Sequence, residues 1–144
     1  MGNIISGKVY DSTINFDDVK YAMDKSYTIV TTMPISECKN MICGTIVPSD
    51  EETHINNLIS DDKLSGTIII YGKNSCDAST HQKYTDLVNF GFTRVFVYTG
   101  GMFEWTLLQD IYGTDEFPTT SFDLDILKFK SANMLNRANL TLLT

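Results

Sequence analysis

The stretch TIIIYGKNSCDASTHQKYTDLVNFGFTRVFVYTGGMFEW, residues 67–105, decides the fold. It opens with Thr67–Tyr71, whose three consecutive isoleucines suit a β-strand that is covered on both faces. A short polar loop at 72–77 leads into a helical pattern, and Arg94–Tyr98 then predicts a second strand that is followed by a further helix. Strands that alternate with helices predict an α/β domain with a mainly parallel sheet.

The sequence before this stretch continues the alternation. Tyr27–Thr31 predicts another buried strand, and apolar residues at helical spacing predict a helix that begins after Asn15. A second helix is predicted from Pro48, with Ser49 and Glu52 forming an S-x-x-E capping box. The three strands together are expected to form the buried centre of the sheet.

Length and composition limit the classes of protein. The chain has 144 residues, of which 42% are hydrophobic and 20% charged, as in one ordinary folded domain. Eleven Lys and Arg against 18 Asp and Glu give a formal net charge of −7, so we expect no nucleic-acid partner. We find no secretory segment and no apolar run of the roughly 20 residues that a membrane span needs. These features predict a cytoplasmic protein.

Three parts are expected along the chain. Residues 1–13 form an N-terminal arm, 14–120 the α/β domain, and 121–144 a C-terminal tail. The apolar residues of the tail roughly fit one helical face, which predicts either a docking helix or a partly disordered segment.

The second half of the domain carries a family resemblance. Gly91-Phe92-Thr93-Arg94-Val95, then Tyr98, Gly100-Gly101 and Trp105 resemble the pattern G-F-x-x-V-x-x-Y/L-x-G-G-x-x-x-W of rhodanese-like domains. The segment 41–48 fits that family's H-I-x-G-A-x-x-x-P more loosely. The amino-acid sequence of residues 100–120 is similar to that of divergent rhodanese-like proteins of large DNA viruses and protists. The resemblance implies a rhodanese-like fold with a five-stranded, mainly parallel sheet in the order 1-5-4-2-3 and helices on both faces.

The polar loop is the candidate site. Backbone amides between a parallel strand and a helix N-terminus form an anion cradle. The residues of this candidate anion-binding loop are Gly72, Lys73, Asn74, Ser75, Cys76 and Asp77. The resemblance implies a catalytic cysteine at its first position, where this chain has Gly72, and an arginine near the position of Asp77. An acid at that place opposes anion binding.

Because the cysteine and arginine of the family pattern are missing from the loop, we consider three hypotheses for the function. We favour a rhodanese-like binding or scaffold module without sulfurtransferase activity, whose protein partner is unknown. The alternative is a rhodanese-type sulfurtransferase that uses Cys76 as a displaced catalytic nucleophile, because a helix N-terminus lowers a thiol pKa and Lys73 and His81 are near in sequence. Against it, we prefer the interpretation that Cys76 packs as an inert thiol at the helix entry. The third hypothesis is a lipid-anchored virion or structural protein.

The third hypothesis depends on the N-terminus. Met1-Gly2-Asn3-Ile4-Ile5-Ser6 matches the N-myristoylation pattern, with Gly2 as the lipidation site. One acyl chain gives only weak membrane association, so the protein is expected at a membrane or virion only if it is myristoylated. We expect no cofactor and no metal site, since Cys38 and Cys43 have no second cysteine pair to complete a zinc site.

Overall fold

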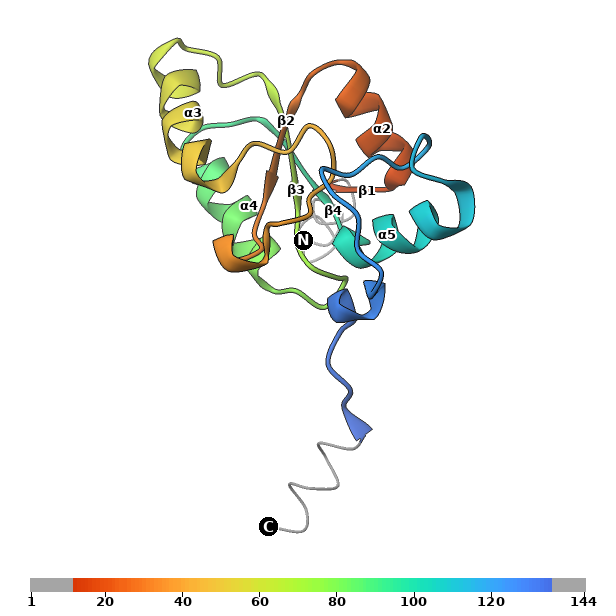
Figure 1. Cartoon of the computed structure of the whole chain (residues 1–144). Helices are drawn as coiled ribbons and strands as arrows, with labels where there is room; N and C mark the ends of the chain where they lie inside the picture. The colour runs from red at the N-terminus through yellow and green to blue at the C-terminus, as the bar shows by residue number, and fades with distance from the viewer. Residues whose placement is uncertain (1–11, 136–144) are drawn as a thin grey trace.

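A computed structural model describes residues 12–135 of the chain. Its sheet has four parallel strands in the order β1-β4-β3-β2, and helices lie on both sides of it (Figure 1). The strands are β1 (Thr13–Ile14), β2 (Thr28–Thr31), β3 (Thr67–Tyr71) and β4 (Arg94–Tyr98). The helices are α2 (Phe16–Asp24), α3 (Pro48–Ser60), α4 (Ser79–Asn89) and α5 (Gly101–Tyr112), and the 3-10 turns are η1 (Ile35–Glu37) and η2 (Ile126–Phe129). The predicted α/β class and the three central strands are confirmed.

Two hydrophobic cores lie on opposite faces of the sheet, which explains why β3 is apolar without alternation. Ile69 and Tyr71 belong to the core that also contains Trp105 of α5. Ile68 and Ile70 point into the other core, beside residues of α3 and α4. Because successive side chains of a strand face opposite ways, a strand with two covered faces needs apolar residues at every position.

The fifth strand expected from the resemblance is replaced by a single bridge, between Ile29 of β2 and Thr45. There the Ile46 amide donates to the Ile29 carbonyl at 2.8 Å. The next amide in parallel register would be that of Pro48, which has no hydrogen to donate. Pro48 begins α3 instead, so the ladder stops after one step. The order of the other four strands is the expected one.

The two predicted helix starts have different outcomes. The Asn15 side chain caps α2 by accepting from the backbone amides of Asp17 and Asp18, as expected of a helix that begins after Asn15. The capping box predicted for α3 is wrong, because Val47 is the cap residue and makes no side-chain cap bond. Pro48 suits the first helical position, which places Ser49 inside the first turn.

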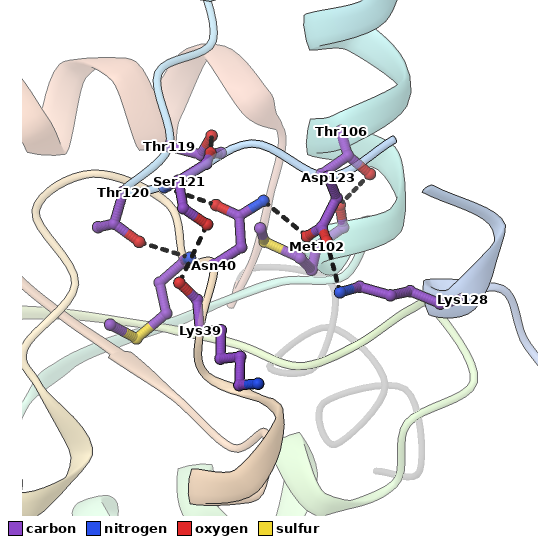
Figure 2. A network of polar contacts seen from close by, with 10 residues as sticks. Lys39, Asn40, Met102, Thr106, Thr119, Thr120, Ser121, Asp123 and Lys128 are labelled. Carbon is purple, nitrogen blue, oxygen red and sulfur yellow. Dashed lines mark hydrogen bonds and ion pairs between the residues drawn. The ribbon is translucent and has the colours of Figure 1, made fainter. Parts of the chain in front are cut away.

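The packed unit continues beyond the expected boundary at residue 120. Asn40 is buried and accepts from the Ser121 amide at 3.0 Å, while its Nδ2 donates to Asp123 at 2.9 Å (Figure 2). Asp123 also pairs with Lys128, and Phe129 is 2% exposed in the core on the α5 side. Within 121–135 the structure has the short turn η2. The prediction for the whole tail, a docking helix or a partly disordered segment, stays a prediction, because residues 136–144 lie outside the described part of the chain.

Two further expectations concern membranes. Within residues 12–135, no helix is both long enough and apolar enough to cross a bilayer. Gly2, the predicted lipidation site, lies outside the described residues.

Candidate functional site

The candidate loop joins the buried end of β3 to α4. Tyr71 ends the strand with its side chain fully buried, and Gly72 behind it is buried as well. The Tyr71 hydroxyl accepts from the Ile42 amide at 3.1 Å and lies 2.8 Å from the Thr45 hydroxyl oxygen. Burial raises the pKa of Tyr71 to about 12 despite these hydrogen bonds. The strand end therefore holds the segment that replaces the fifth strand.

Asp77 folds back into the loop to which it belongs. Its Oδ2 accepts from the Lys73 amide at 3.0 Å, and its Oδ1 accepts from the Ser79 amide at 3.0 Å and the Ser79 hydroxyl at 2.5 Å. Partial burial alone would raise the pKa of Asp77, but these hydrogen bonds and the positive charge of Lys73 outweigh it and hold the pKa below its ordinary value. The Asp77 carboxylate thus accepts hydrogen bonds from backbone amides that could otherwise donate to an external anion.

Gly72, the position of the family's cysteine, faces this carboxylate directly. A Cβ atom added to Gly72 would lie 2.5 Å from Asp77 Oδ2 and 2.9 Å from Thr80 Cγ2. Contacts under 3.0 Å force a neighbour to move, so any side chain at position 72 requires Asp77 to leave its place.

The first turn of α5 packs against the same loop and explains the two glycines of the motif. The amides of Met102 and Phe103 donate to the carbonyls of Gly72 and Lys73 at 3.0 and 2.9 Å. Gly101 has φ +65°, and a Cβ there would lie 2.7 Å from the Gly72 carbonyl oxygen. Gly100-Gly101 thus form a tight strand-to-helix turn, in which the backbone of Gly101 approaches that of Gly72 too closely for a side chain.

Beside these glycines, the first turn of α5 holds a carboxylate to which the sequence analysis gave no role. The buried Tyr98 hydroxyl donates to Glu104 at 2.6 Å, and burial followed by the Glu104 charge raises the pKa of Tyr98. A Cβ on Gly100 would lie 2.5 Å from Glu104 Oε1. A tyrosine at a strand end followed six residues later by an acid was the only sequence sign of this pair.

The remaining loop residues point outward or toward the C-terminal segment. Asn74 accepts from the Cys76 amide at 3.0 Å and donates from Nδ2 to the Phe129 carbonyl at 3.0 Å. Ser75 and Cys76 are exposed. Phe129, 55 residues away in sequence, thus joins the loop to the packed end of the chain, and nothing in the local sequence indicated this contact.

Within the described residues, neither of the groups expected to activate Cys76 forms a hydrogen bond or ion pair with it. Lys73 Nζ pairs with Glu37 at 2.9 Å, and His81 lines a separate cavity of about 180 Å³ beside Tyr84. In the described part of the chain the Cys76 thiol is free and forms no hydrogen bond. The structure brings the six loop residues together around the Asp77 carboxylate, with Cys76 at their outer surface.

The other two cysteines belong to the segment between β2 and α3. Cys38 and Cys43 are half-buried, and burial raises the pKa of both thiols. Among residues 12–135 no three His, Cys, Asp or Glu side chains come together as a metal would require.

Two solved structures share this arrangement of strands and helices. The Alr3790 protein from Anabaena sp. matches 90% of this chain and 91% of its own at 21% identity, with a TM-score of 0.54. A full-length protein from Lactobacillus plantarum matches 84% of this chain and 97% of its own at 15% identity, with a TM-score of 0.60. No protein-family model matches the chain, and no curated protein sequence matches it significantly.

The Alr3790 protein supplies the fold class. A Rhodanese_3 like domain of that protein also matches, over 66% of this chain and 99% of its own, at 23% identity and a TM-score of 0.45, which is too low to support the fold assignment. The longer Alr3790 structure matches above that level, so the chain shares the α/β fold of a protein that contains a Rhodanese_3 like domain. At these identities the likeness concerns the fold alone.

Proposed function

We propose that this chain is a rhodanese-like module that does not transfer sulfur and acts by binding another protein. One observation carries the proposal: the Asp77 carboxylate lies 2.5 Å from the place of a Cβ on Gly72 and accepts from Lys73 and Ser79. The loop already contains a negative charge that belongs to the chain. A rhodanese-like domain with its own anion in the loop has lost the room that a persulfide would need.

Electrostatics supports the same proposal. Two unit charges about 4 Å apart repel by about 4 kcal/mol at the effective dielectric constant near a protein surface. A thiosulfate or persulfide anion that entered the loop would meet the ionised Asp77, whose pKa is lowered and which therefore stays charged at neutral pH. The charge of Lys73 already acts on Asp77 and is also paired with Glu37, so two carboxylates of the chain share it before any external anion arrives.

The test is sulfur transfer from thiosulfate to cyanide, which forms thiocyanate and releases sulfite. Alongside it, intact-mass measurement after thiosulfate treatment detects a persulfide on the protein. We expect neither activity nor persulfide in the unmodified chain. If the chain is active, and Cys76→Ser abolishes the activity while Cys43→Ser leaves it intact, the sulfurtransferase hypothesis replaces ours.

We further propose a cytoplasmic protein of the divergent type found in large DNA viruses and protists, with a fraction of copies myristoylated on Gly2. The M-G-x-x-x-S pattern at residues 1–6 supports the myristoylation, and the amino-acid sequence of residues 100–120 supports the divergent type. A single chain and a net charge of −7 favour only weak binding to anionic membranes. Intact mass after production in a eukaryotic cell tests this, because Gly2→Ala should remove the acyl increment. A spectrum that shows only unmodified Gly2 would reject it.

A further inference from the structure

A groove lies between the end of β2, η1, α3 and α4. Its volume is about 720 Å³, and it is lined by residues from all four of these elements. Its buried apolar residues are Met33, Ile55 and Leu87. Two large apolar side chains on its lining are open to solvent, Ile35 at 72% and Phe90 at 56% exposure. An apolar floor with exposed anchoring side chains is the form of a surface that receives an amphipathic helix.

The lining of the groove is acidic. It contains Glu51, Glu52 and Asp86 against one cation, Lys83. Lys83 is paired with Glu51, whereas Glu52 and Asp86 have no ion pair within the described part of the chain. An occupant that fits this lining is apolar on one side and carries positive charge beside it.

Residues 130–144, KSANMLNRANLTLLT, have these properties. The segment contains Lys130 and Arg137 and no acidic residue, although the whole chain has a net charge of −7. Met134, Ala138 and Leu142 are spaced four apart, which places them on one face of a helix if the segment is helical.

The described part of this segment leaves the body of its own chain. Met134 is 69% and Leu135 84% exposed, and the C-terminal segment before the grey trace points away from the sheet and helices (Figure 1). No residue of 117–135 lines the groove of the same chain. Within residues 12–135, the exposed side chains of Met134 and Leu135 and the apolar groove therefore do not cover each other.

We propose that residues 130–144 of one copy bind as an amphipathic helix in this groove of a second copy. Apolar residues of the segment cover Ile35 and Phe90, and its basic residues face Glu52 and Asp86. Reciprocal exchange of the two segments closes a symmetric dimer. This inference goes beyond the proposed function and does not depend on whether the chain transfers sulfur.

The test is sedimentation equilibrium of the full chain over a range of protein concentrations, at low and high salt. We expect a dimer whose dissociation constant rises with salt. Leu135→Asp in the segment and Ile35→Asp in the groove should each raise that constant roughly ten-fold or more, as loss of a central apolar contact does. Ile111→Asp on α5 is the matched control, since Ile111 is 69% exposed and does not line the groove.

Mixing the two variants separates exchange between copies from binding within one copy. A Leu135→Asp copy keeps its groove and an Ile35→Asp copy keeps its segment, so a mixture retains one intact interface per pair. We expect the mixture to dimerise more strongly than either variant alone, and we expect Glu52→Arg to be rescued by Arg137→Glu. A chain that is monomeric at all concentrations, mixing without effect, or equal loss in Ile111→Asp would overturn the proposal. Far-ultraviolet circular dichroism confirms that each variant is folded.

Discussion

Removing the Asp77 carboxylate tests the central feature of the loop. In Asp77→Ala, the amides of Lys73 and Ser79 and the Ser79 hydroxyl lose their common acceptor. A hydrogen bond to a charged group contributes about 1.5–3 kcal/mol to stability when it is well buried. Asp77 is only half-buried, so water replaces part of what is lost, and we expect a total loss of about 1.5 kcal/mol in the free energy of unfolding. Urea denaturation measures this loss, and Asp110→Ala, an exposed acid on α5, is the control.

The same carboxylate gives the stability a defined dependence on pH. Its pKa is lower in the folded chain than in the unfolded chain, where an aspartate titrates near pH ~3.9. The stabilising contribution is therefore fully present above that value and is lost as the pH falls through the lower, folded pKa. Asp77→Asn should flatten the acid limb of the stability curve relative to the unmodified chain, and the substitution Asp110→Asn on the exposed face of α5 is measured alongside as the control.

A third measurement asks whether the vacated loop accepts an external anion. In Asp77→Ala the amides of Lys73 and Ser79 are available, so sulfate should raise its midpoint of thermal unfolding more than that of the unmodified chain at equal ionic strength. Sulfate also stabilises proteins in general, and Asp110→Ala measures that background. Equal stabilisation of all three proteins, together with an unchanged urea midpoint in Asp77→Ala, would refute the idea that the carboxylate fills the cradle.

Three further substitutions test the surroundings of the loop by urea denaturation. Tyr71→Phe removes the hydroxyl that accepts from the Ile42 amide, and leaving a buried amide without a partner should cost about 1–3 kcal/mol. Gly101→Ala places a Cβ at φ +65° and 2.7 Å from the Gly72 carbonyl oxygen, so we expect a loss of roughly 2 kcal/mol or more. Phe129→Ala empties a buried core position and should cost about 3–5 kcal/mol, whereas a value near zero would show that the segment around η2 is not part of the core.

Much of the fold could be predicted from the sequence because its determinants are local. The isoleucines of β3 needed no partner to indicate a strand with two covered faces, and Asn15 marked a helix start by its own capping side chain. The prediction of a fifth strand was wrong because the length of a strand depends on which residues it pairs with. Only the pairing of Ile46 with Ile29 makes Pro48 the next donor in the ladder.

The candidate site was only partly predictable, for the same reason. The loop at 72–77 and the glycine pair Gly100-Gly101 could be placed by their spacing in the sequence alone. The direction of the Asp77 side chain could not, because an acid in a loop can point to solvent or back to its own amides, and the choice depends on Gly72 having no Cβ. Contacts between distant parts of the chain, such as Asn40 with Asp123 and Asn74 with Phe129, leave no periodic pattern in the sequence.

Gly72 and Asp77 form a coupled pair, and this coupling bears on how the loop differs from a catalytic one. A side chain at 72 clashes with the carboxylate, and without the carboxylate the donors of Lys73 and Ser79 are free for another anion. Gly72→Cys alone should therefore be destabilised by roughly 1–3 kcal/mol through overpacking. In Gly72→Cys with Asp77→Ala the clash with the carboxylate is absent and only the contact with Thr80 remains, so the double variant should be more stable than the sum of the single losses predicts. Additive losses in urea denaturation would mean that the two positions do not compete for the same space.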